Sequence, residues 1–306
     1  MINKLRNAIN EYFVGKEEVT DNVLICLLAG GHVLLEDVPG VGKTTLVKTI
    51  AKATDMSFGR IQFTPDTLPS DVTGVKILNM KTGEFEFKEG AIMKQMILAD
   101  EINRTSPKTQ ASLLEAMAEG AVTVDDVTYK LPEPFMVIAT QNPSGFVGTY
   151  PLPEAQLDRF MMKLSIGYPD TDTQMRLTRN QLEGKTADTV ESVLNASDIM
   201  RMKEKTGKIK VVDSVLKYAS DIIDNTRNEK GFTMGASPRA MIMLIRASQA
   251  KAYMEGRDHV TPDDIKAVSV NVLHHRVSLS YEAKARRENI DSLIYANVLK
   301  AKVPFD

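Results

Sequence analysis

The chain of 306 residues has a single cysteine, Cys26, so no disulfide can form within it. Cys26 stands in the apolar stretch 23–28, which predicts a core residue. Long hydrophobic runs are missing as well, since no stretch approaches the ~20 apolar residues that cross a bilayer. The N-terminus lacks the apolar segment of a signal peptide. We therefore expect a cytoplasmic protein without a membrane span.

An excess of charge of one sign is also absent. Lys and Arg total 38 and Asp and Glu total 40, a net charge of −2, which argues against general nucleic-acid binding. Residues 1–199 hold 19 basic and 27 acidic side chains, whereas residues 200–306 hold 19 and 13. The two regions could attract each other within one chain or between copies, or they could be two solvated surfaces of different composition.

Metal-binding and nucleophile patterns are equally scarce. None of the four histidines has helical i, i+4 spacing to another or lies near the cysteine, which argues against a zinc site. No serine or cysteine stands in a nucleophile motif with a recognisable base. Hydrolysis by a covalent enzyme intermediate is therefore not indicated.

A Gly-rich loop is the strongest positive signal. Residues 39–45 read Pro-Gly-Val-Gly-Lys-Thr-Thr, between the apolar run 32–35 and the helical pattern 46–51. Unpaired N–H groups and the dipole at a helix N-terminus attract phosphate, and glycines allow close approach of the backbone. The loop residues Pro39, Gly40, Val41, Gly42 and Thr45 would cradle a polyphosphate, with Lys43 on its β/γ-phosphates and Thr44 on Mg²⁺.

The loop departs from the usual G-x-x-x-x-G-K-[ST] pattern at one position. Asp37 stands where that pattern has glycine. Asp tolerates turn conformations, so the fold is expected to survive. The expected cost is a negative charge near the phosphates, which leaves the loop geometry and its affinity for nucleotide open.

The order of patterns predicts two domains. From residue 33 to about 166, apolar runs of strand length, including 95–99 and 135–140, alternate with helical patterns, as in a parallel sheet covered by helices. Two hairpins are expected within it, at 75–88 and 122–129. Helices with Thr261 and Asn289 as N-caps follow the linker 166–171. We predict an α/β nucleotide-binding core over 1–168 and a smaller helical domain over 171–306.

Polar residues end two of the predicted strands. Asp100 and Glu101 follow the strand 96–99 at the carboxyl edge, where open α/β sheets bind ligands. Asp100 would hold Mg²⁺ and Glu101 would orient and deprotonate the attacking water. Asn142 follows the next strand and could hold that water or a γ-phosphate oxygen, although Asn before Pro143 is also a common turn initiator.

Two arginines are candidates for stabilising the transition state. Arg159 ends a short helical stretch, and its permanent planar charge suits a phosphoryl group, although a salt bridge to Asp158 or Glu154 is the structural alternative. Arg239 follows Ser237 and Pro238 in the first turn of a predicted helix, where a cation opposes the dipole. A phosphate in front of that helix would explain this placement, and so would a carboxylate from the core.

These motifs together resemble the MoxR family of AAA+ ATPases over nearly the whole chain. Residues 34–44, Asp37 included, resemble that family's P-loop, residues 98–104 its Walker B motif, and residues 62–66 with the following hairpin its helix-2 insert. The resemblance implies a P-loop core with an insert hairpin and an all-helical lid. It makes Asn142 the sensor 1 residue, Arg159 a finger offered to the neighbouring subunit, and Arg239 the sensor 2 residue. Val14 and Gly15 resemble the segment that lines the adenine pocket.

The resemblance further implies an ATP- and Mg²⁺-dependent hydrolase in a hexameric ring. Its role would be chaperone-like remodelling or cofactor insertion, often with a partner that bears a von Willebrand factor A domain. A nucleic-acid-stimulated motor is the first alternative, but Lys76, Lys81 and Lys88 of the hairpin are offset by Glu84, Glu86 and Glu89. A nucleotide-switched binding module with little turnover is the second, and Glu101 together with Arg159 argues against it.

Overall fold

The computed structural model describes residues 1–142 and 148–304, so Pro143 lies outside the described residues. The chain divides into two compact units. The first unit comprises Met1–Asp21, Leu34–Arg159 and Ser165–Met200, and the second comprises Asn22–Val33, Phe160–Leu164 and Arg201–Asp306. The boundary expected between residues 168 and 171 stays a prediction.

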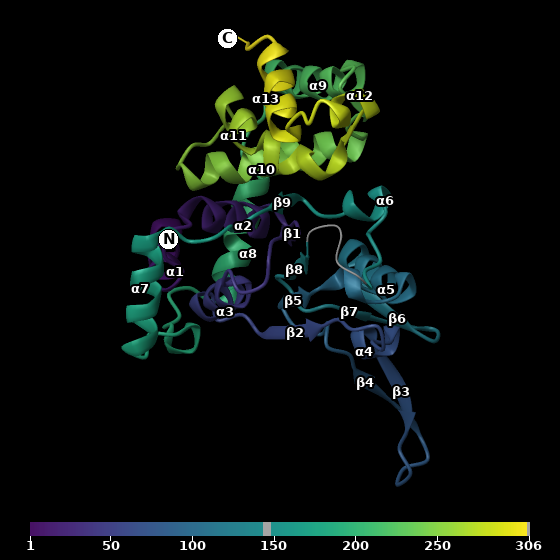
Figure 1. The fold of residues 1–306 in the computed structure, drawn as a ribbon. Helices are drawn as coiled ribbons and strands as arrows, with labels where there is room; N and C mark the ends of the chain where they lie inside the picture. Colours follow the sequence, from purple (N-terminus) through teal and green to yellow (C-terminus); the bar gives the residue numbers. More distant parts are fainter. Residues whose placement is uncertain (143–147, 305–306) are drawn as a thin grey trace. The chain divides into compact units, whose positions relative to one another are not determined.

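A five-stranded sheet has the strand order β2-β5-β8-β1-β9 (Figure 1). Its strands are β1 (Val33–Glu36), β2 (Phe58–Gln62), β5 (Met96–Asp100), β8 (Met136–Gln141) and β9 (Met162–Leu164). β5 lies parallel to β2 and to β8, which confirms the expected parallel sheet. The apolar runs 96–99 and 136–140 are buried, as strands covered on both faces require.

Two helices of the first unit begin at N-cap residues that explain where they start. The helices of this unit include α1 (Ile2–Tyr12), α3 (Lys43–Ala53), α5 (Pro107–Glu119), α6 (Glu154–Leu157) and α7 (Thr171–Leu182), while α2 (Glu17–Ala29) and α8 (Ala196–Gly207) each contribute to both units. α3 follows the Gly-rich loop directly, with Gly42 at φ +92° as its N-cap, a conformation that L side chains rarely adopt. Ser106 caps α5 and accepts a hydrogen bond from the N–H of Thr109.

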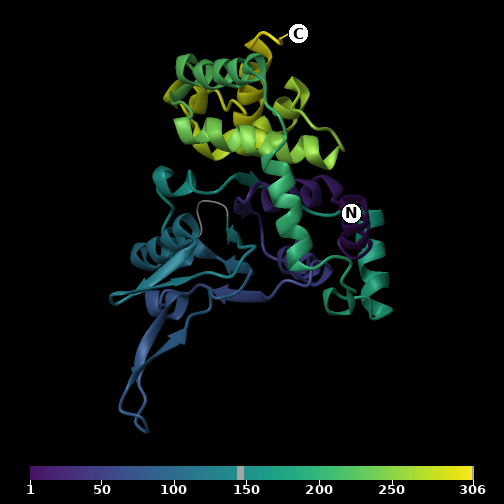
Figure 2. The ribbon, with the colours of Figure 1, turned by 180° about the vertical axis from the view of Figure 1, so that it is seen from behind.

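Both expected hairpins are present. The first pairs β3 (Gly74–Leu78) with β4 (Phe85–Glu89), after the short helix α4 (Pro69–Thr73), and the second pairs β6 (Ala121–Val124) with β7 (Val127–Lys130). The rings of Phe87 and Tyr129 stack with centroids 3.8 Å apart, so the two hairpins pack on each other. The β3–β4 hairpin projects away from the sheet in both views (Figure 1, Figure 2).

The second unit is mainly helical. α9 (Asp213–Asn228), α10 (Pro238–Met254), α11 (Pro262–Leu273) and α13 (Ile290–Lys300) pack together, with the short helix α12 (Tyr281–Ala285) beside them. The predicted N-caps Thr261 and Asn289 are confirmed, and Ser237 is the N-cap of α10. The structure adds a short antiparallel ribbon that the sequence did not reveal, between β10 (Phe232–Met234) and β11 (Ser278–Leu279).

Buried polar groups hold the centre of the second unit. Cys26 is fully buried, as predicted, and burial raises the pKa of its thiol. The Arg276 guanidinium is buried and donates to the carbonyl oxygens of Phe160 and Met161. His275 donates through Nε2 to the same Phe160 oxygen over 2.9 Å, while its Nδ1 has no partner. Across the described residues, no helix is both long and apolar enough to span a membrane.

Candidate functional site

The Gly-rich loop positions Lys43 at the first turn of α3. The side chain of Lys43 is buried, and its Nζ donates to the backbone oxygen of Asp37 over 2.8 Å. Burial lowers the pKa of Lys43, against the opposing effect of the nearby negative charges of Asp37, Asp100 and Glu101. The ammonium group therefore lies within the field of the two acids that end β5.

Asp100 and Glu101 are fixed by a residue on the neighbouring strand. The hydroxyl of Thr140 donates to Asp100 Oδ1 over 2.7 Å and accepts from the backbone N–H of Glu101 over 2.9 Å. Glu101 has φ +57°, an uncommon conformation for a residue other than glycine. The sequence motifs assigned no role to Thr140. Its place as the polar residue that ends the predicted buried strand 135–140 could have marked it as a candidate.

The carboxylate of Glu101 has three side-chain partners. Asn142 Nδ2 donates to Oε1 over 3.1 Å, while Gln62 Nε2 and Arg104 Nη1 donate to Oε2 over 3.0 and 2.9 Å. Glu101 and Asn142, both expected at the carboxyl edge of the sheet, are in direct contact there. The sequence motifs assigned no role to Gln62 or Arg104. Gln62 reaches Glu101 only because the register of β2 with β5 aligns Gln62 with Asp100.

The Gly-rich loop, the polar residues that end β2 and β5, and Asn142 after β8 line one cavity of about 420 Å³. Its lining comprises Pro39, Gly40, Gly42, Lys43, Thr44, Thr45, Arg60, Gln62, Asp100, Glu101 and Asn142. Predicted residues from three separate motifs therefore meet at the carboxyl edge of the sheet. The Thr44 hydroxyl and the Asp100 carboxylate are hard oxygen donors, which fit Mg²⁺, and the described residues contain no cluster of three or more His, Cys, Asp or Glu side chains suited to a metal.

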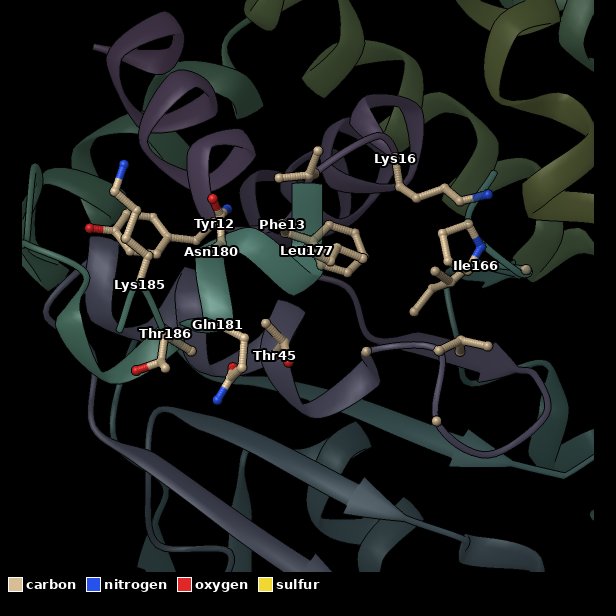
Figure 3. Close-up of a pocket in the computed structure, with 17 residues that line it drawn as sticks. Tyr12, Phe13, Lys16, Thr45, Ile166, Leu177, Asn180, Gln181, Lys185 and Thr186 are labelled. Atoms are coloured by element: carbon tan, nitrogen blue, oxygen red, sulfur yellow. The ribbon is translucent and has the colours of Figure 1, made fainter. Parts of the chain in front are cut away.

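A second cavity, of about 280 Å³, shares Gly40, Gly42 and Thr45 with the first. Its lining comes from the end of α1, the α1–α2 connection, the Gly-rich loop with the start of α3, and α7 with the segments before and after it. Phe13 and Leu177 are among the apolar side chains, and Asn180 and Gln181 among the polar ones (Figure 3). It is lined by Tyr12, Phe13, Val14, Lys16, Gly40, Val41, Gly42, Thr45, Ile166, Gly167, Pro169, Leu177, Asn180, Gln181, Lys185, Thr186 and Ala187.

The two residues expected at an adenine pocket differ in position. Val14 lines the second cavity, whereas Gly15 does not. Gly15 has φ +78°, and a Cβ there would lie 2.4 Å from the hydroxyl oxygen of Thr173. Its part is therefore to let the α1–α2 connection pass close to α7.

The carboxylate of Asp37 does not line the larger cavity. It is buried and accepts hydrogen bonds from Ser165, Ile166 and Gly167 in the connection that leads to α7. Its negative charge still acts on Lys43, whose pKa it raises against the effect of burial.

The two candidate arginines come from other segments of the chain. Arg159, just after α6, donates through Nη1 to the backbone oxygen of Leu114 in α5 over 2.7 Å. It does not line the cavity of its own chain. Arg239 is exposed in the first turn of α10, which belongs to the second unit.

Comparison with known proteins finds two matching families. The ATPase family associated with various cellular activities (AAA) matches residues 32–162, and the AAA lid domain matches residues 224–295. The protein YeaC of Bacillus subtilis (strain 168) is 47% identical over 304 residues, which cover 99% of this chain and 95% of YeaC.

Two further similarities cover almost the whole chain. Chaperone MoxR1 of Mycobacterium tuberculosis (strain H37Rv) is 38% identical over 296 residues, covering 93% of this chain and 78% of MoxR1. The crystal structure of a candidate ATPase from Cytophaga hutchinsonii ATCC 33406 matches with a TM-score of 0.92 and 39% identity, covering 99% of this chain and 94% of that one.

Proposed function

Because the chain belongs to the MoxR family of AAA ATPases, we propose that it binds ATP with Mg²⁺ and hydrolyses it to ADP and phosphate. One observation carries the proposal. Lys43 of the Gly-rich loop, Asp100 and Glu101 of β5, and Asn142 after β8 line a single cavity. This combination suits phosphoryl transfer to water, which requires a cation on the phosphates, a base and a water-positioning amide.

The triphosphate binds along the loop that joins β1 to α3. Lys43 exchanges the carbonyl oxygen of Asp37 for phosphate oxygens, a stronger partner because both groups are charged. Gly40 and Gly42, with φ +86° and +92°, keep the backbone free of side chains where the phosphates approach. Thr44 and Asp100 would hold Mg²⁺, which supplies charge neutralisation on the phosphate oxygens.

Glu101 acts as the general base and Asn142 positions the water. Asn142 Nδ2 donates to Glu101 Oε1 over 3.1 Å, so a water beside this pair would be within reach of both the amide and the carboxylate. Gln62 and Arg104 hold the other carboxylate oxygen and fix the orientation of the base.

The second cavity receives the adenine base. It adjoins the phosphate loop through Gly40, Gly42 and Thr45, which puts base and phosphates on the two sides of the same loop. Phe13, Val14 and Leu177 supply apolar surface for a planar ring. Asn180 and Gln181 offer amide groups for its polar edge.

The active form is a ring, hexameric by the family resemblance, in which Arg159 of one copy completes the site of the next. This assignment accounts for an arginine that lies outside the cavity of its own chain. Arg239 is the lid residue assigned to the γ-phosphate. The work done by the ring is chaperone-like remodelling or cofactor insertion, and the MoxR1 relative is named a chaperone. A partner with a von Willebrand factor A domain belongs to the same proposal.

The test compares two lysines of the same helix. Lys43→Ala should lower ATP turnover by about a hundredfold or more, because it removes a preorganised cation from the phosphates. Lys48→Ala is the control, since Lys48 also lies on α3 but is partly exposed and faces Asp188 at 3.7 Å. Phosphate release by the full chain measures both. Equal turnover in the two variants, or none in the parent chain, would contradict the proposal.

A further inference from the structure

Arg60 is a cation in the larger cavity that the sequence motifs did not reveal. It lies on β2 two residues before Gln62, so both side chains are on the same face of this edge strand. Its Nη2 donates to Asp100 Oδ2 over 2.6 Å and to Gln62 Oε1 over 2.7 Å. Gln62 in turn donates to Glu101, which links Arg60 with both acids of the site.

Both carboxylate oxygens of Asp100 have a donor. Oδ1 accepts from Thr140 and Oδ2 accepts from Arg60. Each oxygen can accept a second bond, but a metal ion that approaches Oδ2, or a water bound to that ion, meets the positive guanidinium of Arg60 there. Mg²⁺ therefore binds Asp100 more strongly where Arg60 has left. The two donors differ in how readily they can leave.

Thr140 is the fixed donor and Arg60 the mobile one. Thr140 is fully buried and its hydroxyl also accepts from the backbone of Glu101, so releasing it would disturb the strand edge. The Arg60 side chain is 47% exposed, whereas that of Asp100 is 14% exposed. A long, half-exposed side chain can leave its partner at little cost, since exposed ion pairs are weak.

We propose that Arg60 competes with Mg²⁺ for Asp100: it neutralises this carboxylate before the metal arrives and turns to solvent once the metal is bound. This inference rests on the proposed ATPase function. Lys43 alone does not balance the charges of Asp100 and Glu101, which would repel an incoming triphosphate, and Arg60 removes part of that repulsion. Its side chain is half-exposed, so water can accept from its donors after the exchange.

The experiment measures how strongly nucleotide binding depends on Mg²⁺. The affinity of the full chain for the non-hydrolysable analogue AMP-PNP is determined by calorimetry, once with excess Mg²⁺ and once with EDTA. The ratio of the two affinities is compared among the parent chain, Arg60→Met, Arg60→Lys and Arg6→Met. Arg6 of α1 is the control, because it also pairs with an aspartate at 2.6 Å, Asp21, but lines neither cavity.

Arg60→Met should raise this ratio about fivefold, the size expected for one partly exposed ion pair. Binding in EDTA weakens because Asp100 is no longer neutralised, and the half-saturating Mg²⁺ concentration at saturating AMP-PNP falls because the competitor is gone. Arg60→Lys keeps the charge but not the fork, so its ratio should lie between the two. Arg6→Met should keep the parent ratio.

An unchanged ratio in Arg60→Met, or an equal rise in Arg6→Met, would overturn the competition while leaving the ATPase proposal intact. Melting curves establish that each variant is folded. If Arg60→Met does not fold, Arg60→Lys tests the competition instead, and its affinity ratio must exceed the parent value. A parent chain that binds no AMP-PNP even with Mg²⁺ would instead overturn the proposed function, and this inference with it.

Discussion

The carboxylate of Asp37 accepts a hydrogen bond from the backbone N–H of Ile166 over 2.7 Å. Ser165 Oγ and the N–H of Gly167 add two further bonds, of 2.8 and 3.0 Å. Asp37 thus ties the loop that holds Lys43 to the connection before α7, whose Ile166 and Gly167 line the second cavity. The departure from the glycine of the usual loop pattern has a structural reason, which is to fix one wall of that cavity.

Asp37→Asn should therefore weaken binding of the base more than binding of the phosphates. An amide has one acceptor oxygen, and its NH₂ group would face donors of the wall, which are the Ser165 hydroxyl and the N–H groups of Ile166 and Gly167, so the wall would shift. We expect the affinity for ADP to fall about tenfold, equivalent to one lost buried hydrogen bond to a charged group. The affinity for inorganic tripolyphosphate should stay within about twofold, as measured by calorimetry.

Asp66→Asn makes the same chemical change at an exposed position of the first unit and should alter neither affinity. Equal losses for ADP and tripolyphosphate in Asp37→Asn would indicate that Asp37 acts through the phosphate loop alone.

Glu101→Gln should separate binding from hydrolysis. The amide keeps the shape of the side chain and the contact with Asn142, but it cannot take a proton from water. ATP turnover is expected to fall by about 10²- to 10⁴-fold while ATP affinity changes little. Rapid-quench measurement of hydrolysis, combined with retention of ATP on the full chain, distinguishes the two effects.

The control for this variant is Glu115→Gln, at an exposed position of α5, which should turn over ATP as the parent chain does. If Glu101→Gln hydrolysed ATP at the parent rate, the base would have to be sought elsewhere among the residues of the cavity.

The order of the motifs along the chain was enough to predict some residues of the site. Residues that reach the site only through the pairing and register of the strands were missed. Lys43, Asp100 and Asn142 end or follow elements of one parallel sheet, so their order along the chain was enough to bring them to one edge. Thr140 was missed because its contact with Asp100 depends on which strands are neighbours and how they align. Arg60 was missed for the same reason. The β3–β4 hairpin separates β2 from β5 along the chain, so no local sequence pattern shows that Arg60 meets Asp100.

Asp37 illustrates a different limit. Its type and position in the loop were plain from the sequence, but the direction of its side chain was not. The donors that satisfy its charge lie about 130 residues further along the chain, and no local pattern marks them. Long-range hydrogen bonds of this kind are specified by packing and not by propensity.

The buried His275 should make stability depend on pH. Burial, and then the charges of Arg276, His274 and Lys163, hold its pKa well below the usual value, against the hydrogen bond to Phe160. The unfolded chain takes up a proton near pH 6.5 and the folded chain does not, so the free energy of unfolding decreases as pH falls below that value. The slope amounts to about 1.4 kcal/mol per pH unit at most.

His275→Gln can keep a donor to the Phe160 oxygen but does not titrate, so it should flatten the decline of melting temperature between about pH 6.5 and pH 5. His259→Gln removes a histidine whose side chain is 56% exposed and should leave the decline as it is. The same slope in the parent chain and in His275→Gln would show that other groups set the acid sensitivity of the second unit.

Arg159→Ala should abolish ATP turnover, and mixing this variant with a second inactive variant, Lys43→Ala, should restore part of it. Where an arginine acts in trans, its removal costs about 10³- to 10⁵-fold in rate. In a ring, Lys43→Ala protomers lack a working phosphate site but still carry Arg159, whereas Arg159→Ala protomers have the site but no finger to lend. Mixed rings therefore contain interfaces with both groups intact, and mixing the two inactive proteins should restore part of the phosphate release.

Arg176→Ala, at an exposed position of α7, is the arginine control and should match the parent chain. Because Arg159 also donates to Leu114 within its own chain, melting curves must show that Arg159→Ala is folded before its rate is interpreted. Turnover per protomer in the parent chain should rise with protein concentration, since the site is complete only after assembly. A folded Arg159→Ala variant that stays inactive when mixed, or that hydrolyses ATP at the parent rate alone, would rule out a shared site.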